Sequence, residues 1–409
     1  MQEMTMNKEL PPIRMLVLTL TGRCNFKCQY CYASEQEQID MDKETALSAV
    51  KMAGESGERF LLQFSGGEPL LQFPLIREIV NLVEDYQMNV QLQIQTNGAL
   101  LTKDIGKWLF DHKVGIGISC DGRPGVMDRT RKSKTGEPSS QMVSKAFRNL
   151  SENGIGTGIT CVVTDDMVDE LEGISDMAYF YGNVHQIGFD ILREQGRGMR
   201  LKAPDEKQMT AALRKTADRL DMLEKITGRH IRFTQEDRVE MLARTGKYEF
   251  PQCFAMNGEA AFIDVHGDIY ACSSLMGRED YKLGNVKTGR EKNKVDKVSA
   301  FIKEIMQPCR ECEYFSLCGG GCFSRWMDKN GKFKRSEAEC ALKKFFIHRY
   351  LKDRRKQYEQ TKSISFYGNN RAGCYEEGLV IKCNQSQTGR CIDTGRKRDC
   401  QINGSSCIG

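Results

Sequence analysis

Short apolar runs alternate with amphipathic helical stretches over the first 240 residues of the chain. The runs have the length and composition of buried parallel strands and cover 15–20, 60–64, 90–95, 114–119, 158–163 and 184–191. The helical stretches between them cover 43–55, 75–86, 102–111, 141–153 and 168–181, and a longer one covers 205–227. About six βα units predict a parallel sheet, as an open partial barrel or a doubly wound sheet. In both folds, chemistry is expected in the loops that follow the strands' carboxyl ends.

This alternation stops after residue 245, where cysteine becomes frequent. We therefore expect a short N-terminal segment (1–12), an α/β domain (13–244), a small cysteine-rich domain (245–360) and a tail (361–409). The cysteine-rich domain is expected to end in a helix rich in Lys and Arg over 341–360. The tail is rich in Gly, Asn, Ser and Cys and has no clear periodicity, which indicates irregular structure.

The composition fits a folded protein and excludes several classes of partner. Hydrophobic residues make up 40% of the 409 residues and charged residues 28%, so a mainly disordered chain is not expected. A net charge of +5 is too small to indicate nucleic acid or an anionic membrane as a partner. No apolar run approaches the roughly 18 residues of a membrane span, and the N-terminus lacks the apolar core of a signal peptide. We therefore expect a cytoplasmic protein, where its 17 cysteines are better explained as ligands than as disulfides.

Three of these cysteines form a tight group, Cys24, Cys28 and Cys31, directly after the first predicted strand. Three thiolates on one short loop can hold three irons of a 4Fe–4S cluster and leave the fourth iron open for another ligand. The alternative is structural zinc, which requires four ligands in a closed tetrahedral site. The nearest histidine is His112, and no fourth cysteine follows at a finger-like spacing. The spacing therefore favours iron–sulfur chemistry.

With the aromatic Tyr30 before its last cysteine, this triplet resembles the signature of radical S-adenosylmethionine (radical SAM) enzymes. The resemblance implies a partial (β/α)6 barrel, and it makes Tyr30 a candidate cofactor-binding residue. It also implies that the open iron binds the amino and carboxylate groups of S-adenosylmethionine. One-electron reduction would then cleave its C5′–S bond, giving a 5′-deoxyadenosyl radical that abstracts hydrogen from the substrate. In such an enzyme the cofactor supplies the chemistry, and the protein supplies position and seclusion.

The segment Ser65-Gly66-Gly67-Glu68-Pro69, after the second predicted strand, resembles the Gly-Gly-Glu-Pro motif of the same family. Its glycines permit close approach of the backbone to a ligand, and the resemblance implies that Glu68 accepts from the ammonium group of S-adenosylmethionine. Alone, the same letters would describe an ordinary turn.

Polar residues at the next strand ends are further candidates for cofactor contacts. By resemblance, Ser119 and Arg131 would contact the ribose and the carboxylate of S-adenosylmethionine, and Asn97 and Asp121 are additional candidates. The alternative for each is a role in turn formation at the end of a strand.

A second series contains seven cysteines, Cys253, Cys272, Cys309, Cys312, Cys318, Cys322 and Cys340. It resembles the pattern of the SPASM domain, which binds one or two auxiliary 4Fe–4S clusters. The resemblance implies one cluster on Cys309, Cys312, Cys318 and Cys340, and another on Cys253, Cys272 and Cys322. The second set lacks a fourth protein ligand, so one iron would be open, or filled by a substrate thiolate or a tail cysteine. The alternative is a pair of zinc knuckles, and Cys120 and Cys161 are expected to be plain buried thiols.

SPASM enzymes mostly modify peptides or proteins, so the resemblance implies a peptide maturase. Our leading expectation is a thioether cross-link, from cysteine sulfur to carbon, in a ribosomally made, cysteine-rich peptide. An alternative is formylglycine formation on a sulfatase, whose maturases carry a catalytic Asp directly after the second cysteine of the series. Here that residue is Ser273, which counts against this alternative, although another carboxylate could substitute. The remaining alternative is a non-catalytic iron–sulfur or zinc scaffold, and the sequence assigns no catalytic residue.

A maturase of this kind needs a reducing electron donor, such as flavodoxin or ferredoxin, besides its peptide. The tail suggests a further possibility, because its five cysteines stand at separations of 9, 8, 9 and 7 residues among small polar residues. They are Cys374, Cys383, Cys391, Cys400 and Cys407. The hypothesis is that the tail is an in-cis substrate or a substrate mimic. The alternatives are a disordered thiol-rich extension, a small zinc or disulfide knot, and a source of cluster ligands.

Overall fold

The computed structural model describes residues 10–245, 253–328 and 330–367, with side chains up to residue 355. The five tail cysteines therefore lie outside the described residues, and their role stays a prediction.

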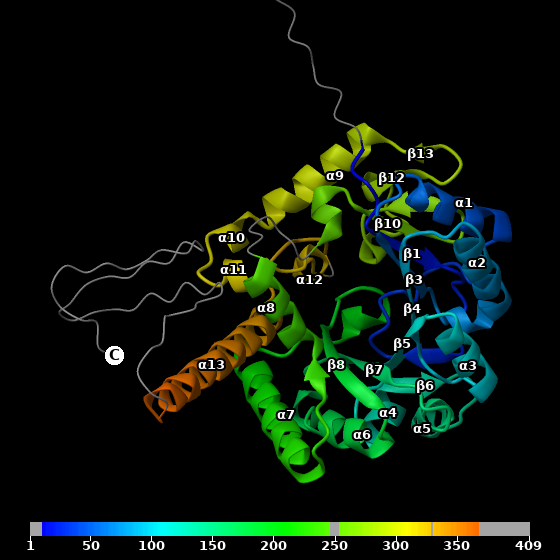
Figure 1. Cartoon of the computed structure of the whole chain (residues 1–409). Helices are drawn as coiled ribbons and strands as arrows, with labels where there is room; N and C mark the ends of the chain where they lie inside the picture. The colour runs from blue at the N-terminus through cyan, green and yellow to red at the C-terminus, as the bar shows by residue number, and fades with distance from the viewer. Residues whose placement is uncertain (1–9, 246–252, 329, 368–409) are drawn as a thin grey trace, which may run out of the picture.

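One eleven-stranded sheet organises the protein, and its two end strands do not pair with each other (Figure 1). Its strands, in spatial order, are β13 (Gly289–Arg290), β12 (Lys282–Asn285), β11 (Asp268–Tyr270), β10 (Ala260–Ile263), β1 (Met15–Thr19), β3 (Phe60–Ser65), β4 (Val90–Thr96), β5 (Gly115–Ser119), β7 (Thr157–Val163), β8 (Val184–Ile191) and β9 (Arg232–Phe233). In this order, each strand from β10 through β1 to β9 pairs in parallel with the next. The pairs β10–β11, β11–β12 and β12–β13 are antiparallel. The predicted open α/β fold with a parallel sheet is thus confirmed.

Helices cover the outer face of the parallel strands (Figure 1). They are α1 (Lys43–Gly54), α2 (Phe73–Asp85), α3 (Lys103–Asp111), α4 (Pro124–Thr130), α5 (Ser139–Ser151), α6 (Gly173–Tyr181), α7 (Glu206–Thr227) and α8 (Thr234–Thr245). Each strand and helix predicted before residue 245 is present within about two residues of its expected bounds, except the helix expected over 168–181. That stretch is divided into a 3-10 turn, Val168–Glu170, and α6, which begins at Gly173. Glycine is a poor residue for a helix interior, which agrees with a break there.

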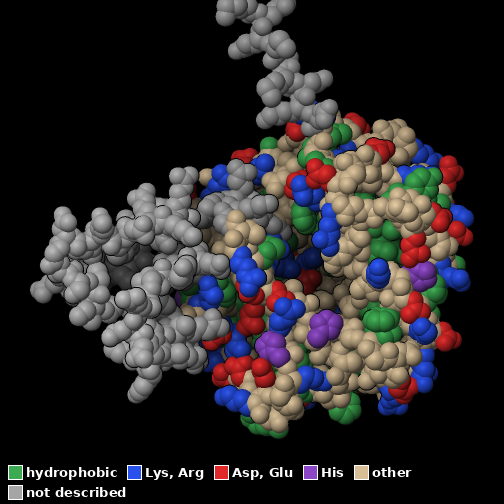
Figure 2. Space-filling model, in the orientation of Figure 1, with side chains coloured by type: hydrophobic (Ala, Val, Ile, Leu, Met, Phe, Trp, Pro, Cys, Tyr) green, Lys and Arg blue, Asp and Glu red, His purple; other side chains and the backbone are tan. Residues whose placement is uncertain are grey.

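The two faces of the parallel strands differ in polarity because side chains alternate along each strand. On β4, Leu92 and Ile94 are buried in the core, whereas Gln93 and Gln95 are half-buried. Gln93 donates to Gln63 of β3 (2.9 Å) and Gln95 donates to Ser119 of β5 (3.1 Å), so these side chains share one face. Figure 2 shows a hollow near the centre of one side of the molecule, with charged side chains at its floor. The inner, polar face is therefore suited to bind a polar ligand.

The region after residue 245 continues the same sheet, which the sequence did not predict. Strand β10 pairs in parallel with β1, with Met15 opposite Ala260 and Leu18 opposite Ile263. The 14-residue helix α9 (Lys292–Ile305) follows, and three short helices then lie among the later cysteines: α10 (Gln307–Arg310), α11 (Phe315–Cys318) and α12 (Phe323–Trp326). This region also has 3-10 turns at Phe254–Asn257, Ser273–Leu275 and Glu279–Tyr281, and the α/β part has them at Pro69–Gln72 and Gly196–Arg200. The expected domain boundary at residues 244–245 stays a prediction. The backbone hydrogen bonds between β1 and β10 connect the segments on its two sides.

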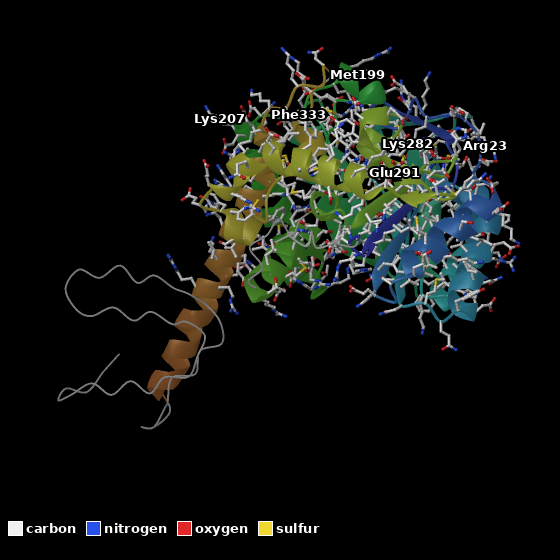
Figure 3. The ribbon with its side chains drawn as sticks, turned by 90° about the horizontal axis from the view of Figure 1, so that it is seen from above. Arg23, Met199, Lys207, Lys282, Glu291 and Phe333 are labelled. Atoms are coloured by element: carbon white, nitrogen blue, oxygen red, sulfur yellow. The ribbon has the colours of Figure 1, made fainter. Side chains whose placement is uncertain are left out.

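The last described helix, α13 (Glu337–Tyr367), is longer than the helix expected over 341–360. Its first half packs on α7 and α8, where Arg349 pairs with Asp221 (2.5 Å) and Glu236 (2.5 Å). Its second half leaves the body of the protein (Figure 3). In the described part of the chain, no helix has the length and apolar character needed to cross a bilayer.

Candidate active site

The triplet loop, residues 24–31, leaves the carboxyl end of β1 and includes the short strand β2 (Phe26–Cys28). Strand β2 pairs with β6 (Arg131–Ser133), which places Cys28 opposite Arg131. Cys24, Cys28 and Cys31 are free, half-buried thiols. Burial raises the pKa of Cys24 and raises that of Cys28 to about 12, and the neighbouring thiols of the triplet add to both rises. An iron-free loop would therefore hold protons on the sulfurs of Cys24 and Cys28, whereas a bound metal would replace these protons.

Asn97, at the end of β4, lies against this loop. Its Nδ2 is 3.8 Å from Cys24 Sγ and donates to Asn25 Oδ1 (2.7 Å). Its Oδ1 accepts from Ala99 N (3.0 Å), which is the turn role considered as the alternative. Asn97 therefore forms a strand-end turn and also orients the first cysteine of the triplet.

The two glycines after β3 serve the packing of two loops against each other. Gly67 N donates to Thr21 O (2.7 Å), and a Cβ added to Gly67 would lie 2.1 Å from Arg23 O. Gly66 has a φ of +134°, and its added Cβ would lie 2.4 Å from Thr21 O. The glycines therefore allow close approach of the backbone at Thr21 and Arg23, directly before the triplet loop, and their expected close approach to a ligand stays a prediction.

Glu68 is fully buried and accepts three hydrogen bonds from the protein. The donors are Thr96 Oγ1 (2.6 Å), Asn97 N (2.8 Å) and Leu70 N (3.1 Å). Burial raises the pKa of Glu68, and these donors oppose the rise. The carboxylate thus ties the end of β3 to the end of β4, and its expected contact with S-adenosylmethionine stays a prediction.

Asp121, after β5, collects three of the expected site residues into one buried cluster. Its Oδ2 accepts from Tyr30 Oη (2.5 Å), Thr130 Oγ1 (2.6 Å) and Arg131 Nε (3.1 Å). The Arg131 guanidinium lies 5.2 Å from the centre of the Tyr30 ring. Burial raises the pKa of Tyr30, so its hydroxyl stays protonated and donates. This cluster holds a cation beside Cys28 and fixes the residue that precedes Cys31.

Ser119 lies on the polar inner face and has a different set of partners. Its Oγ accepts from Gln95 Nε2 (3.1 Å), and Gln95 Oε1 accepts from Thr160 Oγ1 (3.2 Å). The structure therefore places Ser119 in a polar row across three strands. Its expected contact with a ribose stays a prediction.

The second cysteine series falls into two neighbourhoods in the structure. The thiol of Cys253 interacts electrostatically with Cys272 and Cys322, and burial raises its pKa to about 12. The thiol of Cys309 interacts with Cys318 and Cys340, and burial raises its pKa to about 11.

Cys312 lies with the second neighbourhood, because both it and Cys309 interact electrostatically with Arg335. Arg335 Nε also donates to Cys340 Sγ (3.1 Å). This arrangement agrees with the expected division of the series into sets of three and four. Among the side chains described, no three His, Cys, Asp or Glu residues are arranged to hold a metal ion, so the ligand roles stay predictions.

Arg193, just after β8, was missed by the sequence analysis and joins the two cysteine regions. Its guanidinium lies 4.5 Å from the centre of the Tyr32 ring, directly after the triplet. Its Nη1 donates to Ser274 (3.0 Å) and Ser273 (3.3 Å), directly after Cys272.

Asp190, at the carboxyl end of β8, links Arg193 to a second arginine. It lies 3.6 Å from Arg193 and 2.5 Å from Arg325, which also pairs with Glu339 (2.9 Å). Although burial raises the pKa of Asp190, the two arginines outweigh it and hold that pKa below its usual range. A polar residue inside an apolar strand was the available signal for Asp190, but its partner Arg325 is 135 residues away in the sequence.

Comparisons with known proteins agree with this geometry. The model of the radical SAM superfamily matches residues 18–178. An uncharacterised protein of Methanocaldococcus jannaschii is 32% identical over 285 residues, which cover 69% of this chain and 91% of that relative. The cysteine-type anaerobic sulfatase-maturating enzyme of Clostridium perfringens (strain 13 / Type A) is 25% identical over 342 residues, covering 76% and 89%. The solved structure of native anSMEcpe with bound AdoMet and Cp18Cys peptide shares the fold, with a TM-score of 0.70 and 22% identity, covering 86% of this chain and all of that one.

Proposed function

The chain belongs to the radical SAM superfamily, and from this membership we propose that it is an oxidoreductase that modifies a cysteine-containing peptide. The observation that carries the proposal is the placement of the triplet loop at the carboxyl edge of an open sheet, with Arg193 between it and the second cysteine series. The sulfatase-maturating relative supports a peptide or protein substrate, and a solved structure of the same kind of enzyme has a peptide bound.

Cys24, Cys28 and Cys31 would hold the 4Fe–4S cluster to which S-adenosylmethionine binds. The donor set fits, because the structure gathers three thiols on one loop and places Arg131 beside them. When bound, these groups would supply the hydrogen-abstracting radical, and auxiliary clusters on the second series would supply an electron acceptor.

The protein's own residues would position the cofactor and exclude water. Asp121 fixes Arg131, a cation able to bind the carboxylate of S-adenosylmethionine. Glu68 fixes Asn97 against the triplet loop, and Ser119 offers a hydroxyl on the inner face. A reducing protein such as flavodoxin or ferredoxin would be the electron donor.

The leading reaction is formation of a thioether in the peptide. A carbon–sulfur bond forms between the cysteine and a carbon of the peptide. That carbon loses a hydrogen atom to the radical, the cysteine thiol loses a proton, and one electron would pass to an auxiliary cluster. Cationic surroundings favour the thiolate that this reaction needs. Arg193 next to Ser273 and Ser274 provides such surroundings at the edge of the second series.

Formylglycine formation is the second candidate, because sulfatase-maturating enzymes are among the relatives. The residue after Cys272 counts against it, since Ser273 carries no carboxylate and accepts from Arg193. Asp190 is the carboxylate beside Arg193, but its lowered pKa makes it a weak base.

The test is anaerobic turnover with S-adenosylmethionine, a reductant and cysteine-containing peptides, followed by mass spectrometry. A thioether removes two hydrogens and keeps the sulfur, whereas formylglycine replaces the thiol with an aldehyde. Changing Cys24, Cys28 and Cys31 to alanine should abolish both the iron chromophore and 5′-deoxyadenosine. If the unchanged protein makes no 5′-deoxyadenosine with any peptide, the scaffold alternative holds. The same spectra, taken on the protein's own tail, test whether the tail is a substrate.

A further inference from the structure

A partly buried group of charges adjoins Cys272 and Cys322. It contains three cations, Arg193, Arg325 and Lys343, and two carboxylates, Asp190 and Glu339. The arginine side chains are only 17% and 16% exposed. An excess positive charge in such a place is unfavourable unless an anion balances it.

Two nitrogen–hydrogen donors in this group have no hydrogen-bond partner among the described residues. They are Nε of Arg193 and Nε of Arg325, and both atoms are buried. Leaving a buried donor unpaired costs about 1–3 kcal/mol, so such donors are rare in folded proteins. The surplus cation and the two donors therefore fit an anionic hydrogen-bond acceptor that binds here.

The position of Arg193 indicates which acceptor this is. Cys272 and Cys322, two of the three cysteines in the smaller set, lie near enough to Arg193 to interact with its charge, and Cys322 also interacts with that of Arg325. Ser273 and Ser274 hold the Arg193 side chain against the Cys272 segment. The sulfur atoms of a cluster held by this set would be anionic hydrogen-bond acceptors beside Arg193 and Arg325.

We propose that Arg193 is a positioning residue for the auxiliary cluster of Cys253, Cys272 and Cys322, and that it raises the reduction potential of that cluster. This inference rests on the proposed function, which places a cluster there. Hydrogen bonds and positive charge at the sulfurs stabilise the reduced, more negative state. A higher potential makes the cluster a better acceptor for the electron that substrate oxidation releases.

The experiment is an anaerobic redox titration of the auxiliary clusters by electron paramagnetic resonance. The parent protein carries Cys24, Cys28 and Cys31 changed to alanine, so that its remaining signals come from the second series. Into this parent we introduce Arg193→Gln and Arg193→Met, which remove the charge, and Arg193→Lys, which keeps it. If one neutral variant does not fold, the other replaces it. Iron and sulfide content are measured for every variant.

The matched control is Arg229→Gln. Arg229 likewise lies over a tyrosine ring, at 4.8 Å from the centre of Tyr179, and has a buried Nε without a hydrogen-bond partner among the described residues. Its other nitrogens cap α6 by donating to the carbonyls of Ala178 and Gly182. It is part of no cysteine neighbourhood described above, so its loss should leave both auxiliary potentials unchanged.

We expect the neutral variants to move one of the two midpoint potentials to a more negative value. The expected change is at least tenfold in the ratio of oxidised to reduced cluster, or about 59 mV for one electron. Arg193→Lys should stay closer to the parent. Unchanged potentials in variants with full iron content would overturn the inference. If in addition the KM for the peptide rises, Arg193 binds a carboxylate of the peptide instead. A parent without iron in the second series would overturn the proposed auxiliary clusters themselves, which is a distinct result.

Discussion

The substitution Asp121→Asn tests the buried cluster that connects the triplet loop to β5. Asp121 is fully buried, and its carboxylate balances the charge of Arg131, whose side chain is 6% exposed. An amide at this position keeps an acceptor oxygen but leaves the guanidinium without a counter-charge. Breaking one partner of a buried ion pair costs about 3–5 kcal/mol, which is a large share of the stability of a typical domain.

The assay is urea unfolding of the anaerobic protein, followed by circular dichroism. The matched control is Asp176→Asn, because Asp176 also pairs with arginines, Arg123 (2.6 Å) and Arg219 (2.7 Å), but its side chain is 23% exposed. That substitution should cost about 0–1 kcal/mol, as for other surface pairs.

A second variant separates the lost pair from the lost packing. Combining Asp121→Asn with Arg131→Met removes both charges, and the double variant should recover part of the lost stability. If Arg131 binds the carboxylate of S-adenosylmethionine, the affinity for this cofactor should fall in both the Asp121→Asn variant and the double variant. An Asp121→Asn protein as stable as the Asp176→Asn control would refute the reasoning about the buried pair.

Three further predictions follow from local geometry. Gly67→Ala should reduce the iron content, since the added Cβ would lie 2.1 Å from Arg23 O and displace the triplet loop; an unchanged iron-to-protein ratio would contradict this. After removal of iron with a chelator, iodoacetamide at pH 8 should modify Cys312, in an open surface pocket, before Cys28, whose pKa is raised to about 12, and peptide mapping would reveal the order. His185 has a pKa lowered chiefly by burial, so its contribution to stability is present above pH 6.5 and is lost as pH falls through the folded pKa. His185→Gln should therefore flatten the loss of thermal stability as the pH falls below about 6.5, and identical slopes would disprove it.

The sequence predicted the parallel strands and their helices well because each of these elements has a local signal. Alternation on β4 separates the buried Leu92 and Ile94 from Gln93 and Gln95, and the same pattern recurs on β7. Local motifs also located the triplet and the strand-end residues. Short spacings along the chain become short distances in space when a tight loop carries them.

Contacts between distant segments could not be predicted in this way. Arg193 and Ser274 are separated by 81 residues, and nothing near Arg193 indicates that it will meet a serine. Gly67 likewise packs against Arg23, 44 residues earlier, and no local pattern indicates that contact. In both cases the partner is fixed by tertiary packing and leaves no periodic signal.

The pairing of β10 with β1 has a consequence for how the protein is made. During synthesis, Met15–Leu18 leave the ribosome long before their neighbours Ala260–Ile263 exist. One edge of β1 must therefore stay unpaired, exposed or covered by a chaperone, until β10 has been synthesised, and such distant pairings form slowly. Because β1 leads directly into the loop of Cys24, insertion of iron is expected to follow the synthesis of β10.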